Sequence, residues 1–123
     1  MINYLAVHHS GGYEHDPFAS TKDLTFDEMN NAHQSRWPDF PSQLDNKIFI
    51  GYNIVLFPDR MVQTRLIGEE TAANKSYNQN TVSVCMVGNF TKFGNIAIDR
   101  VTPYQEEMVE KIGVALLENN PGS

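Results

Sequence analysis

The sequence predicts a single α/β domain in which helices pack on a β-sheet. Its 123 residues suit one domain, and 41% hydrophobic with 20% charged residues is typical of a globular chain. Short apolar segments rich in β-formers alternate with two segments of helical periodicity. The resulting order of strand, helix, β-hairpin, strand and helix predicts a sheet with helices lying against it.

The first third of the chain predicts a strand, a loop and a helix. Residues 2–7 are apolar and lead into a polar loop that begins at His8. Thr25 and Glu28 have the spacing of a capping box, which predicts a helix start. Pro38 and Pro41 end that helix. One helical face carries residues spaced by three and four, namely Phe26, Met29, His33 and Trp37.

The middle of the chain predicts a hairpin and a central strand. Residues 49–57 and 61–67 are expected strands, joined by a turn at residues 58–60. Residues 68–80 are polar and are expected to form a surface loop. Residues 82–87 are largely apolar, which suits the centre of a sheet.

The last third predicts a loop and a long helix. Residues 88–101 form the loop, interrupted by a short apolar segment at 96–98. Thr102 as the cap, Pro103 at the first position and Gln105 at the third predict the helix start. The apolar stripe of this helix is expected at Met108, Ile112, Ala115 and Leu116, and the segment 119–122 stops it.

Composition excludes several classes of protein. Nine Lys and Arg against 15 Asp and Glu give a net charge of −6, and the basic residues are scattered. A nucleic-acid partner is not expected, because phosphate neutralisation needs clustered cations. No apolar run reaches the roughly 20 residues of a membrane span. The start of the sequence lacks a basic region and a long apolar core, so we expect cytoplasmic synthesis without a signal peptide.

His8 and His9 are the first candidates for chemistry, because they end a predicted buried strand. A neutral imidazole fixed there could bind zinc, whereas the alternative is one packed and one solvated histidine. Tyr52 could donate a hydrogen bond to a reacting carbonyl, or be an ordinary cross-strand aromatic residue. His33 shares a helical face with apolar residues, which favours a hydrogen-bonded core role.

The sequence predicts one role for Cys85 and leaves two roles open for Arg65. Cys85 lies inside an apolar strand, which indicates a small buried residue and not a nucleophile, because burial raises a thiol pKa. As the only cysteine, it excludes an intrachain disulfide. Arg65 could bind a carboxylate or form a structural ion pair, and the sequence does not choose between them.

Three segments in order resemble a known family. They are Val-His-His-Ser at residues 7–10, Phe-Ile-Gly-Tyr-Asn-Ile-Val at 49–55 and Asn-Thr-Val-Ser-Val-Cys-Met-Val-Gly-Asn-Phe at 80–90. Residues 58–65 and 102–105 add a matching turn and helix start. Together they resemble the zinc-dependent N-acetylmuramoyl-L-alanine amidases, which include phage lysozyme-type amidases and peptidoglycan recognition proteins. The similarity runs from about Asn3 to Leu117.

The resemblance implies a fold, a cofactor and a reaction. The fold is a central mixed β-sheet flanked by helices, and the reaction cleaves the amide between N-acetylmuramic acid and the L-alanine of the stem peptide. Zn²⁺ is the family cofactor. His8 matches the first zinc ligand, and Tyr52 matches a tyrosine that orients water and stabilises the oxyanion. His33 matches a helix histidine of less defined role.

Other positions depart from the family pattern. Arg60 replaces the usual glycine of the turn, and Asn53 stands where many members have a second histidine. His9 matches a variable position, so His9, His33, Asn53 and Arg65 are predicted at most to bind substrate or to support the site. The family's last strand and its two remaining zinc ligands follow the last helix, beyond residue 123.

Two functions are therefore expected from the resemblance. One is a peptidoglycan hydrolase of the endolysin or autolysin type that acts on the cell wall of bacteria once released. Because two zinc ligands of the family have no match in residues 1–123, we expect weak zinc binding and weak or no hydrolysis by this chain. The other is a zinc-less module that binds muropeptide. We expect His8 at the end of a central strand, close to Tyr52. Because the last strand is missing, we also expect self-association through the vacated sheet edge.

Overall fold

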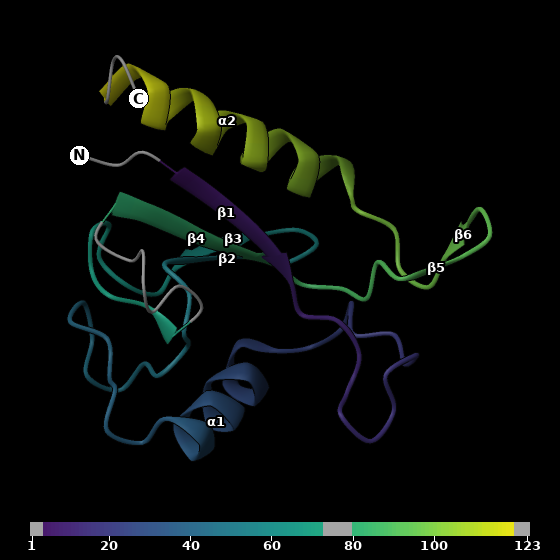
Figure 1. Cartoon of the computed structure of the whole chain (residues 1–123), viewed down its shortest axis with the longest axis horizontal. Helices are drawn as coiled ribbons and strands as arrows, with labels where there is room; N and C mark the ends of the chain where they lie inside the picture. Colours follow the sequence, from purple (N-terminus) through teal and green to yellow (C-terminus); the bar gives the residue numbers. More distant parts are fainter. Residues whose placement is uncertain (1–3, 73–79, 120–123) are drawn as a thin grey trace.

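The structure, a computed structural model, describes residues 4–72 and 80–119. In chain order its elements are β1 (Tyr4–His9), α1 (Phe26–Arg36), β2 (Ile54–Leu56), β3 (Met61–Gln63), β4 (Thr81–Met86), β5 (Lys92–Phe93), β6 (Ile96–Ala97) and α2 (Pro103–Asn119). A sheet lies between the two helices, with α2 against one face and α1 below the other (Figure 1). The expected α/β fold with a helix-flanked sheet is confirmed.

The main sheet has the strand order β1-β4-β2-β3. β4 runs parallel to both β1 and β2, and β3 runs antiparallel to β2, so the sheet is mixed. β4 is central, as its apolar sequence predicts. β1 is at the edge of the described sheet, so the expectation of a central strand ending at His8 is wrong.

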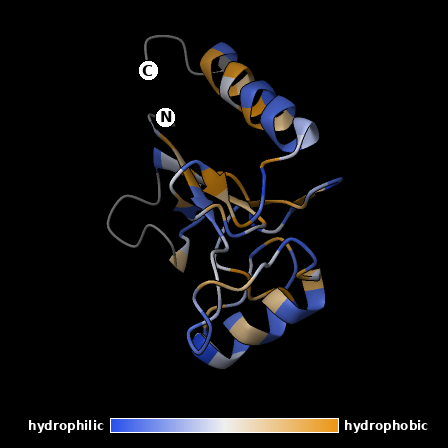
Figure 2. Cartoon of the chain, turned by 90° about the vertical axis from the view of Figure 1, so that its right-hand side faces the viewer, coloured by the Kyte–Doolittle hydropathy of each residue, from blue (hydrophilic) through white to orange (hydrophobic). Residues whose placement is uncertain are grey.

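Each face of the sheet has its own apolar core, because strand side chains alternate between faces. On the α2 face, Leu56 and Val84 pack with Met108 and Ile112. On the α1 face, Met29 packs with residues that include Val55, Phe57, Cys85 and Val87. Hydrophobic colouring accordingly concentrates in the strands between the helices (Figure 2).

The strands of the hairpin are shorter than the sequence predicts. Of residues 49–57 only Ile54–Leu56 form a strand, and of residues 61–67 only Met61–Gln63. The reason lies at Asn53, whose carbonyl accepts the N–H groups of both Thr64 and Arg65, at 2.8 and 3.1 Å. Two residues facing one carbonyl break the regular ladder, so Tyr52 lies in a bend before β2 and not in a strand.

Other boundaries also differ from expectation. β1 continues through His9, two residues past the expected end. The predicted loop at 88–101 contains the small hairpin of β5 and β6. The expected loop at 68–80 lies partly outside the described residues, as does the predicted stop of the last helix.

Both predicted helix starts are confirmed. Thr25 and Glu28 exchange side chain to backbone hydrogen bonds at the start of α1, at 3.0 and 3.1 Å. Thr102 and Gln105 do the same at the start of α2, again at 3.0 and 3.1 Å. Gln105 is fully buried, and its Nε2 also donates to the carbonyls of Leu56 and Val87 at the ends of β2 and β4.

The apolar stripe of α2 differs from the prediction at one position. Met108, Ile112 and Leu116 pack on the sheet together with Val109, whereas Ala115 is exposed. Neither described helix combines the length and apolar character that a membrane span requires.

Candidate functional site

Three aromatic rings from three segments meet on the α1 face of the sheet. The His8 and Tyr52 ring centroids are 5.6 Å apart, and those of His33 and Tyr52 are 5.9 Å apart. His8 comes from the end of β1, Tyr52 from the bend before β2 and His33 from α1. The expectation that His8 lies close to Tyr52, on one face of the sheet, is confirmed.

Gly51 lets this cluster form, because Ala72 and the Trp37 ring, just after α1, both approach it closely. A Cβ at residue 51 would lie 2.9 Å from Cβ of Ala72 and 3.3 Å from Cζ3 of Trp37. The Gly51 N–H donates to Nδ1 of His33 at 2.9 Å. The glycine thus leaves room for Ala72 and Trp37, while its N–H ties His33 of α1 to the segment that presents Tyr52.

One ring nitrogen of His8 is buried and makes no hydrogen bond. Its Nε2 is the one buried side-chain nitrogen or oxygen without a hydrogen-bond partner in the described part of the chain. Burial lowers the pKa of His8, and the neighbouring charge of His9 lowers it further. The neutral imidazole is therefore favoured, which is the form that binds a metal ion.

The described residues do not make a complete zinc site. Residues 4–72 and 80–119 contain no group of three His, Cys, Asp or Glu side chains that could hold a metal ion. A catalytic zinc needs three protein ligands. Of the groups beside Tyr52, only His8 has an unpartnered buried nitrogen, because Nδ1 of His33 accepts the Gly51 N–H and burial keeps the Cys85 thiol protonated. Among the described residues, His8 is therefore the one side chain of this cluster that could serve as a zinc ligand.

Tyr52 and Cys85 are held in their protonated forms. Burial raises the pKa of Tyr52, and the nearby Cys85 thiol raises it further. Burial also raises the pKa of Cys85, to about 12. Tyr52 can therefore donate a hydrogen bond at neutral pH, and the prediction that Cys85 is a buried residue without nucleophilic character is confirmed.

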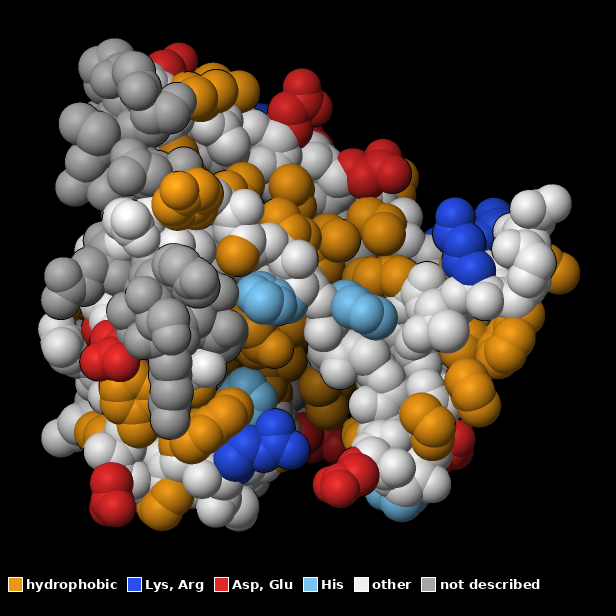
Figure 3. Space-filling view, viewed as in Figure 1, with side chains coloured by type: hydrophobic (Ala, Val, Ile, Leu, Met, Phe, Trp, Pro, Cys, Tyr) orange, Lys and Arg blue, Asp and Glu red, His pale blue; other side chains and the backbone are white. Residues whose placement is uncertain are grey.

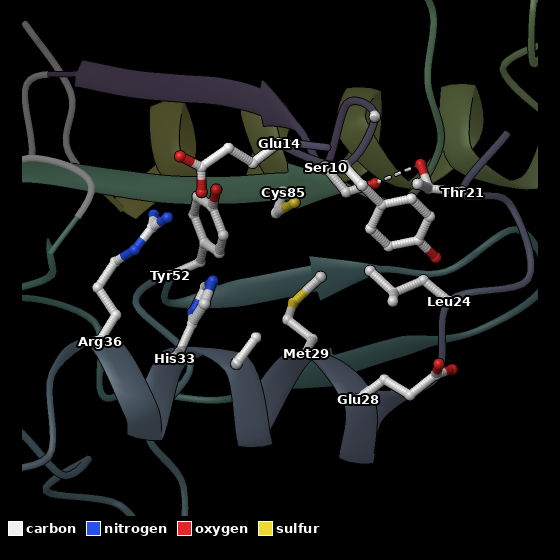
Figure 4. Close-up of a pocket in the computed structure, with 13 residues that line it drawn as sticks. Ser10, Glu14, Thr21, Leu24, Glu28, Met29, His33, Arg36, Tyr52 and Cys85 are labelled. Carbon is white, nitrogen blue, oxygen red and sulfur yellow. Dashed lines mark hydrogen bonds between the residues drawn. The ribbon is translucent and has the colours of Figure 1, made fainter. Parts of the chain in front are cut away.

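A pocket of about 490 Å³ opens beside this ring cluster. Its walls come from α1, from the loop after β1 and from the sheet, and Figure 4 shows Tyr52, His33 and Cys85 facing it. In the space-filling view, histidine side chains border the hollow between the α1 side and the opposite loop (Figure 3). The pocket has an apolar floor at Met29 and polar groups on its walls, among them Ser10.

The loop that forms one wall is tied down by Asp99. Its carboxylate accepts hydrogen bonds from Ser20 Oγ at 2.5 Å, from the Thr21 N–H at 3.0 Å and from the Asn89 N–H at 2.7 Å. Although burial opposes it, these bonds lower the pKa of Asp99 below its usual range. Thr21 Oγ1 also donates to the carbonyl of Gly11, at 2.6 Å.

Sequence reasoning missed several residues of this pocket. Glu14, Ser10 and Thr21 lie in a loop without periodicity, so no pattern showed where their side chains point. Arg36 could have been found, because it follows Glu28 by eight residues and His33 by three, which places all three near one helical face.

The remaining predicted residues lie outside the ring cluster. His9 is exposed and stacks on Phe90 with a centroid distance of 5.7 Å. Asn53 is fully buried, with Oδ1 accepting from the Ser83 N–H at 2.8 Å and Nδ2 donating to the Leu66 carbonyl at 2.9 Å. It cannot contact a substrate, so direct binding by Asn53 is ruled out and only a supporting role fits.

Of the two roles predicted for Arg65, carboxylate binding and a structural ion pair, the structure shows the ion pair. It is fully buried, and its guanidinium pairs with Glu69 at 2.9 Å. It also donates to the carbonyls of Ile50 and Phe40, at 2.7 and 2.6 Å. With its donors taken by the protein, Arg65 has none for a substrate carboxylate.

The chain was compared with known proteins. The sequence matches no family model, and no curated protein matches it. Solved structures do match. They include the N-acetylmuramoyl-L-alanine amidase LysC from Clostridium intestinale URNW, with a TM-score of 0.67 at 17% identity, over 96% of this chain and 64% of that one.

Peptidoglycan recognition proteins match equally well. Drosophila PGRP-SA aligns with a TM-score of 0.66 at 16% identity, over 96% of this chain and 60% of that one. Apis mellifera PGRP-SA gives 0.63 at 18% identity, over 96% and 63%. This chain therefore spans less than two thirds of the length of these structures. It has the fold shared by the N-acetylmuramoyl-L-alanine amidases and the peptidoglycan recognition proteins.

Proposed function

We propose that this chain binds peptidoglycan, taking part of a muropeptide into the pocket beside Tyr52. The observation that carries the proposal is a pocket lined by Tyr52 and His33, with the His8 ring next to Tyr52, in a fold shared with amidases and peptidoglycan recognition proteins. That fold alone does not assign an activity, so the proposal depends on the pocket.

The pocket suits a ligand that is partly apolar and partly polar. Leu24 and Met29 offer apolar contact, and Tyr52 offers a hydroxyl group. Its volume of about 490 Å³ lies within the range of small-molecule sites, which is ample for a few peptide residues. A stem peptide next to its sugar has this mixture of methyl, amide and charged groups.

Blocking the pocket tests this proposal. Ala32 is exposed on α1 and lines the pocket, so Ala32→Trp should fill it without disturbing a core. In a co-sedimentation assay with purified peptidoglycan sacculi, we expect this variant to bind with at least tenfold lower affinity. Ala115→Trp, at an exposed position on α2, is the matched control and should bind like the unchanged protein. Equal binding by both variants would contradict the proposal.

A second candidate function is hydrolysis of the muramoyl-L-alanine amide. The observation in its favour is the unpartnered Nε2 of His8, next to a tyrosine that stays protonated. Zinc, when bound at such a site, activates water and polarises the amide carbonyl. The residues of this chain that would take part are His8 as one ligand and Tyr52 as a hydrogen-bond donor.

Stem-peptide release separates the two functions. Muramoyl-peptide would be incubated with the protein and added Zn²⁺, and free stem peptide would be measured. Release that disappears in both His8→Ala and Tyr52→Phe would support hydrolysis. No release, with sacculus binding intact, would leave recognition as the function. In either case the proposed place of action is the bacterial cell wall, as for a phage endolysin or a bacterial autolysin.

A further inference from the structure

Two phenylalanine rings, here called the ring pair, lie exposed on the surface, and neither is among the described residues that line the pocket. Phe18 comes from the loop after β1 and Phe93 from β5, and their ring centroids are 5.1 Å apart. Phe18 is 59% exposed and Phe93 58%, and Ile96, the cross-strand partner of Phe93, is 75% exposed. Contiguous apolar side chains with this much exposure are typical of binding surfaces.

The β5–β6 hairpin presents one apolar face. Gly94 has a φ of 63°, as a glycine at the first position of a tight two-residue turn does. Directly paired residues of an antiparallel ladder point to the same face, so Phe93 and Ile96 share one face, and Lys92 points to the other. Figure 1 shows the hairpin projecting away from the main sheet.

Two buried polar residues fix the backbone beneath the ring pair. Asn89 Nδ2 donates to the carbonyls of Pro17 and Ala19, on either side of Phe18, at 2.9 Å each. At the base of the hairpin, the Asp99 carboxylate accepts the Asn89 N–H at 2.7 Å, and the Asp99 N–H donates to the Asn89 carbonyl at 2.8 Å. Because ordered backbone presents both rings, little conformational entropy is lost when a ligand binds them.

The size of the patch favours a small ligand over a protein. The ring pair and Ile96 together expose on the order of 300–400 Å², given that one phenylalanine offers roughly 150–250 Å². A stable protein interface takes about 800 Å² from each partner. The patch is therefore too small for a protein partner by itself.

The charges around the ring pair are mixed and do not favour an anionic membrane. Lys92 and Arg100 are exposed on or next to the hairpin, whereas Asp16, two residues before Phe18, is an exposed acid. Figure 3 shows Lys and Arg side chains on one side of the apolar side chains of this lobe and acidic side chains on the other. Two cations also fall short of the clusters of about four to eight with which proteins bind anionic lipid.

An uncharged sugar fits these features. The C–H groups on one face of a pyranose ring pack against an aromatic face, while its hydroxyl and N-acetyl groups take hydrogen bonds at the rim. Thr91 and Asn95 are exposed on or beside the same hairpin and offer neutral hydrogen-bonding groups. Aromatic contact with a few polar groups around it is the usual composition of a small-molecule site.

The ring pair adjoins the pocket across one closely packed loop. Gly12 lines the pocket, and a Cβ at this position would collide with the carbonyl group of Pro17. Phe18 follows Pro17 directly, so only this loop separates the pocket from the ring pair. In Figure 3 the hollow and the apolar side chains of the hairpin lie on the same face of the molecule. One glycan strand that bears stem peptides can therefore contact both.

We infer that Phe18 and Phe93 form a second binding surface, which takes the uncharged N-acetyl sugars of a glycan strand. The inference extends the proposed function and rests on it for the choice of glycan, because it assigns the sugars and the stem peptide to separate surfaces. Sugar rings stack on the ring pair, and Ile96 widens the apolar contact. A strand held at both surfaces binds more tightly than one held at the pocket alone, because the second contact is intramolecular.

Chitin tests the inference without a stem peptide. It is a polymer of N-acetylglucosamine that carries no peptide, so its binding does not depend on the pocket. We expect the protein to co-sediment with chitin beads. A soluble chitin oligosaccharide should shift the backbone amide NMR signals of Gly94 and Asn95, at the turn of the hairpin. Ala32→Trp, which fills the pocket, should still bind chitin.

Two variants at one position show whether the ring itself matters. Phe93→Leu keeps an apolar side chain without a ring and should bind chitin about tenfold more weakly. Phe93→Tyr keeps the ring face and should bind like the unchanged protein. Tyr4→Leu is the matched control, because Tyr4 is also 59% exposed but belongs to the start of β1, away from the hairpin (Figure 1). It should bind chitin normally, and circular dichroism would check that all three variants fold.

The outcomes separate this inference from the proposed function. No binding to chitin, or equal binding by Phe93→Leu and Phe93→Tyr, would overturn the inference and leave pocket recognition standing. Binding to phosphatidylglycerol vesicles without binding to chitin would mark a membrane-facing patch and would also overturn it. If Ala32→Trp binds sacculi normally while Phe93→Leu loses chitin, the pocket proposal is wrong and the inference stands.

Discussion

The N–H of Gly51 donates to Nδ1 of His33 across 2.9 Å, which fixes the histidine proton on Nε2. The ring is then held between Trp37, at a centroid distance of 5.1 Å, and Tyr52, at 5.9 Å. Protonating Nδ1 would break the bond from Gly51 and place a charge in the cluster. The backbone of one segment thereby sets both the orientation and the neutral state of a pocket residue.

This arrangement predicts a loss of stability in mild acid. His33 has its pKa lowered to about 4, mainly by burial, so the unfolded chain takes up its proton first as the pH falls. The contribution of His33 is complete above about pH 6.5 and is lost as the pH falls toward 4. Denaturant unfolding at a series of pH values should show this decline.

Two variants assign that decline to His33. His33→Gln should flatten it, though a part should stay because His8 also has a lowered pKa. His15→Gln, at an exposed histidine, should keep the slope of the unchanged protein. An identical slope in all three proteins would show that His33 is not the source.

The buried pair of Arg65 and Glu69 predicts a large effect of a small change. Glu69→Gln leaves the Arg65 guanidinium buried without its counter-charge, which should cost about 3–5 kcal/mol of unfolding free energy. Glu107→Gln removes the partner of Lys111 in an exposed pair of the same spacing, and should cost less than about 1 kcal/mol. Similar losses by chemical denaturation would contradict the structural role of Arg65.

Asp99 links the pocket loop to the connection before α2, so its replacement should loosen that wall. Asp99→Asn weakens bonds to Ser20, Thr21 and Asn89, which should cost about 1–3 kcal/mol. Because hydrogen bonds hold its pKa low, the carboxylate stabilises the fold above the usual carboxyl pKa and stops doing so as the pH falls through its lowered value. Asp59→Asn, at an exposed turn, should be neutral by thermal unfolding.

We expect the chain to self-associate through the exposed edge of β1. Within residues 4–72 and 80–119, β1 pairs with β4 on one side only, and Tyr4 and Val7 are 59% and 43% exposed. The backbone groups of such an edge can pair with another strand. Light scattering over a concentration series should reveal dimers or larger species. Val7→Lys should suppress them, whereas Met61→Lys on the other edge strand should not. A strict monomer at roughly millimolar concentration would contradict the prediction.

The parts of the fold that depend on local chemistry could be predicted from the sequence. Both capping boxes and the central strand follow from short patterns whose causes lie within a few residues. The extent of the hairpin could not be predicted, because β2 begins only after Asn53, whose carbonyl bonds to Thr64 and Arg65 in a way that no local pattern shows. The edge position of β1 is also a tertiary result, since periodicity does not give strand order.

The site was predictable only in part for the same reason. The meeting of His8 with Tyr52 followed from family motifs, and the structure places the two rings together. Arg65 and Asn53 were both candidates for substrate binding or for a supporting role, but both are fully buried, and burial depends on the whole fold. Glu14 gave no signal because its loop is positioned by Asp99, which lies 85 residues away along the chain.

Gln105 joins three segments that lie far apart in the sequence. Its amide bonds to carbonyls at the ends of β2 and β4, and Thr102 Oγ1 bonds to the carbonyl of Pro58 at 2.7 Å. The first turn of α2 therefore opens only when both strand ends open with it, whereas the later turns depend on half-buried apolar contacts. Amide hydrogen exchange should be slowest near Gln105 and faster toward Glu118, so that α2 loosens from its far end while the two strands stay joined.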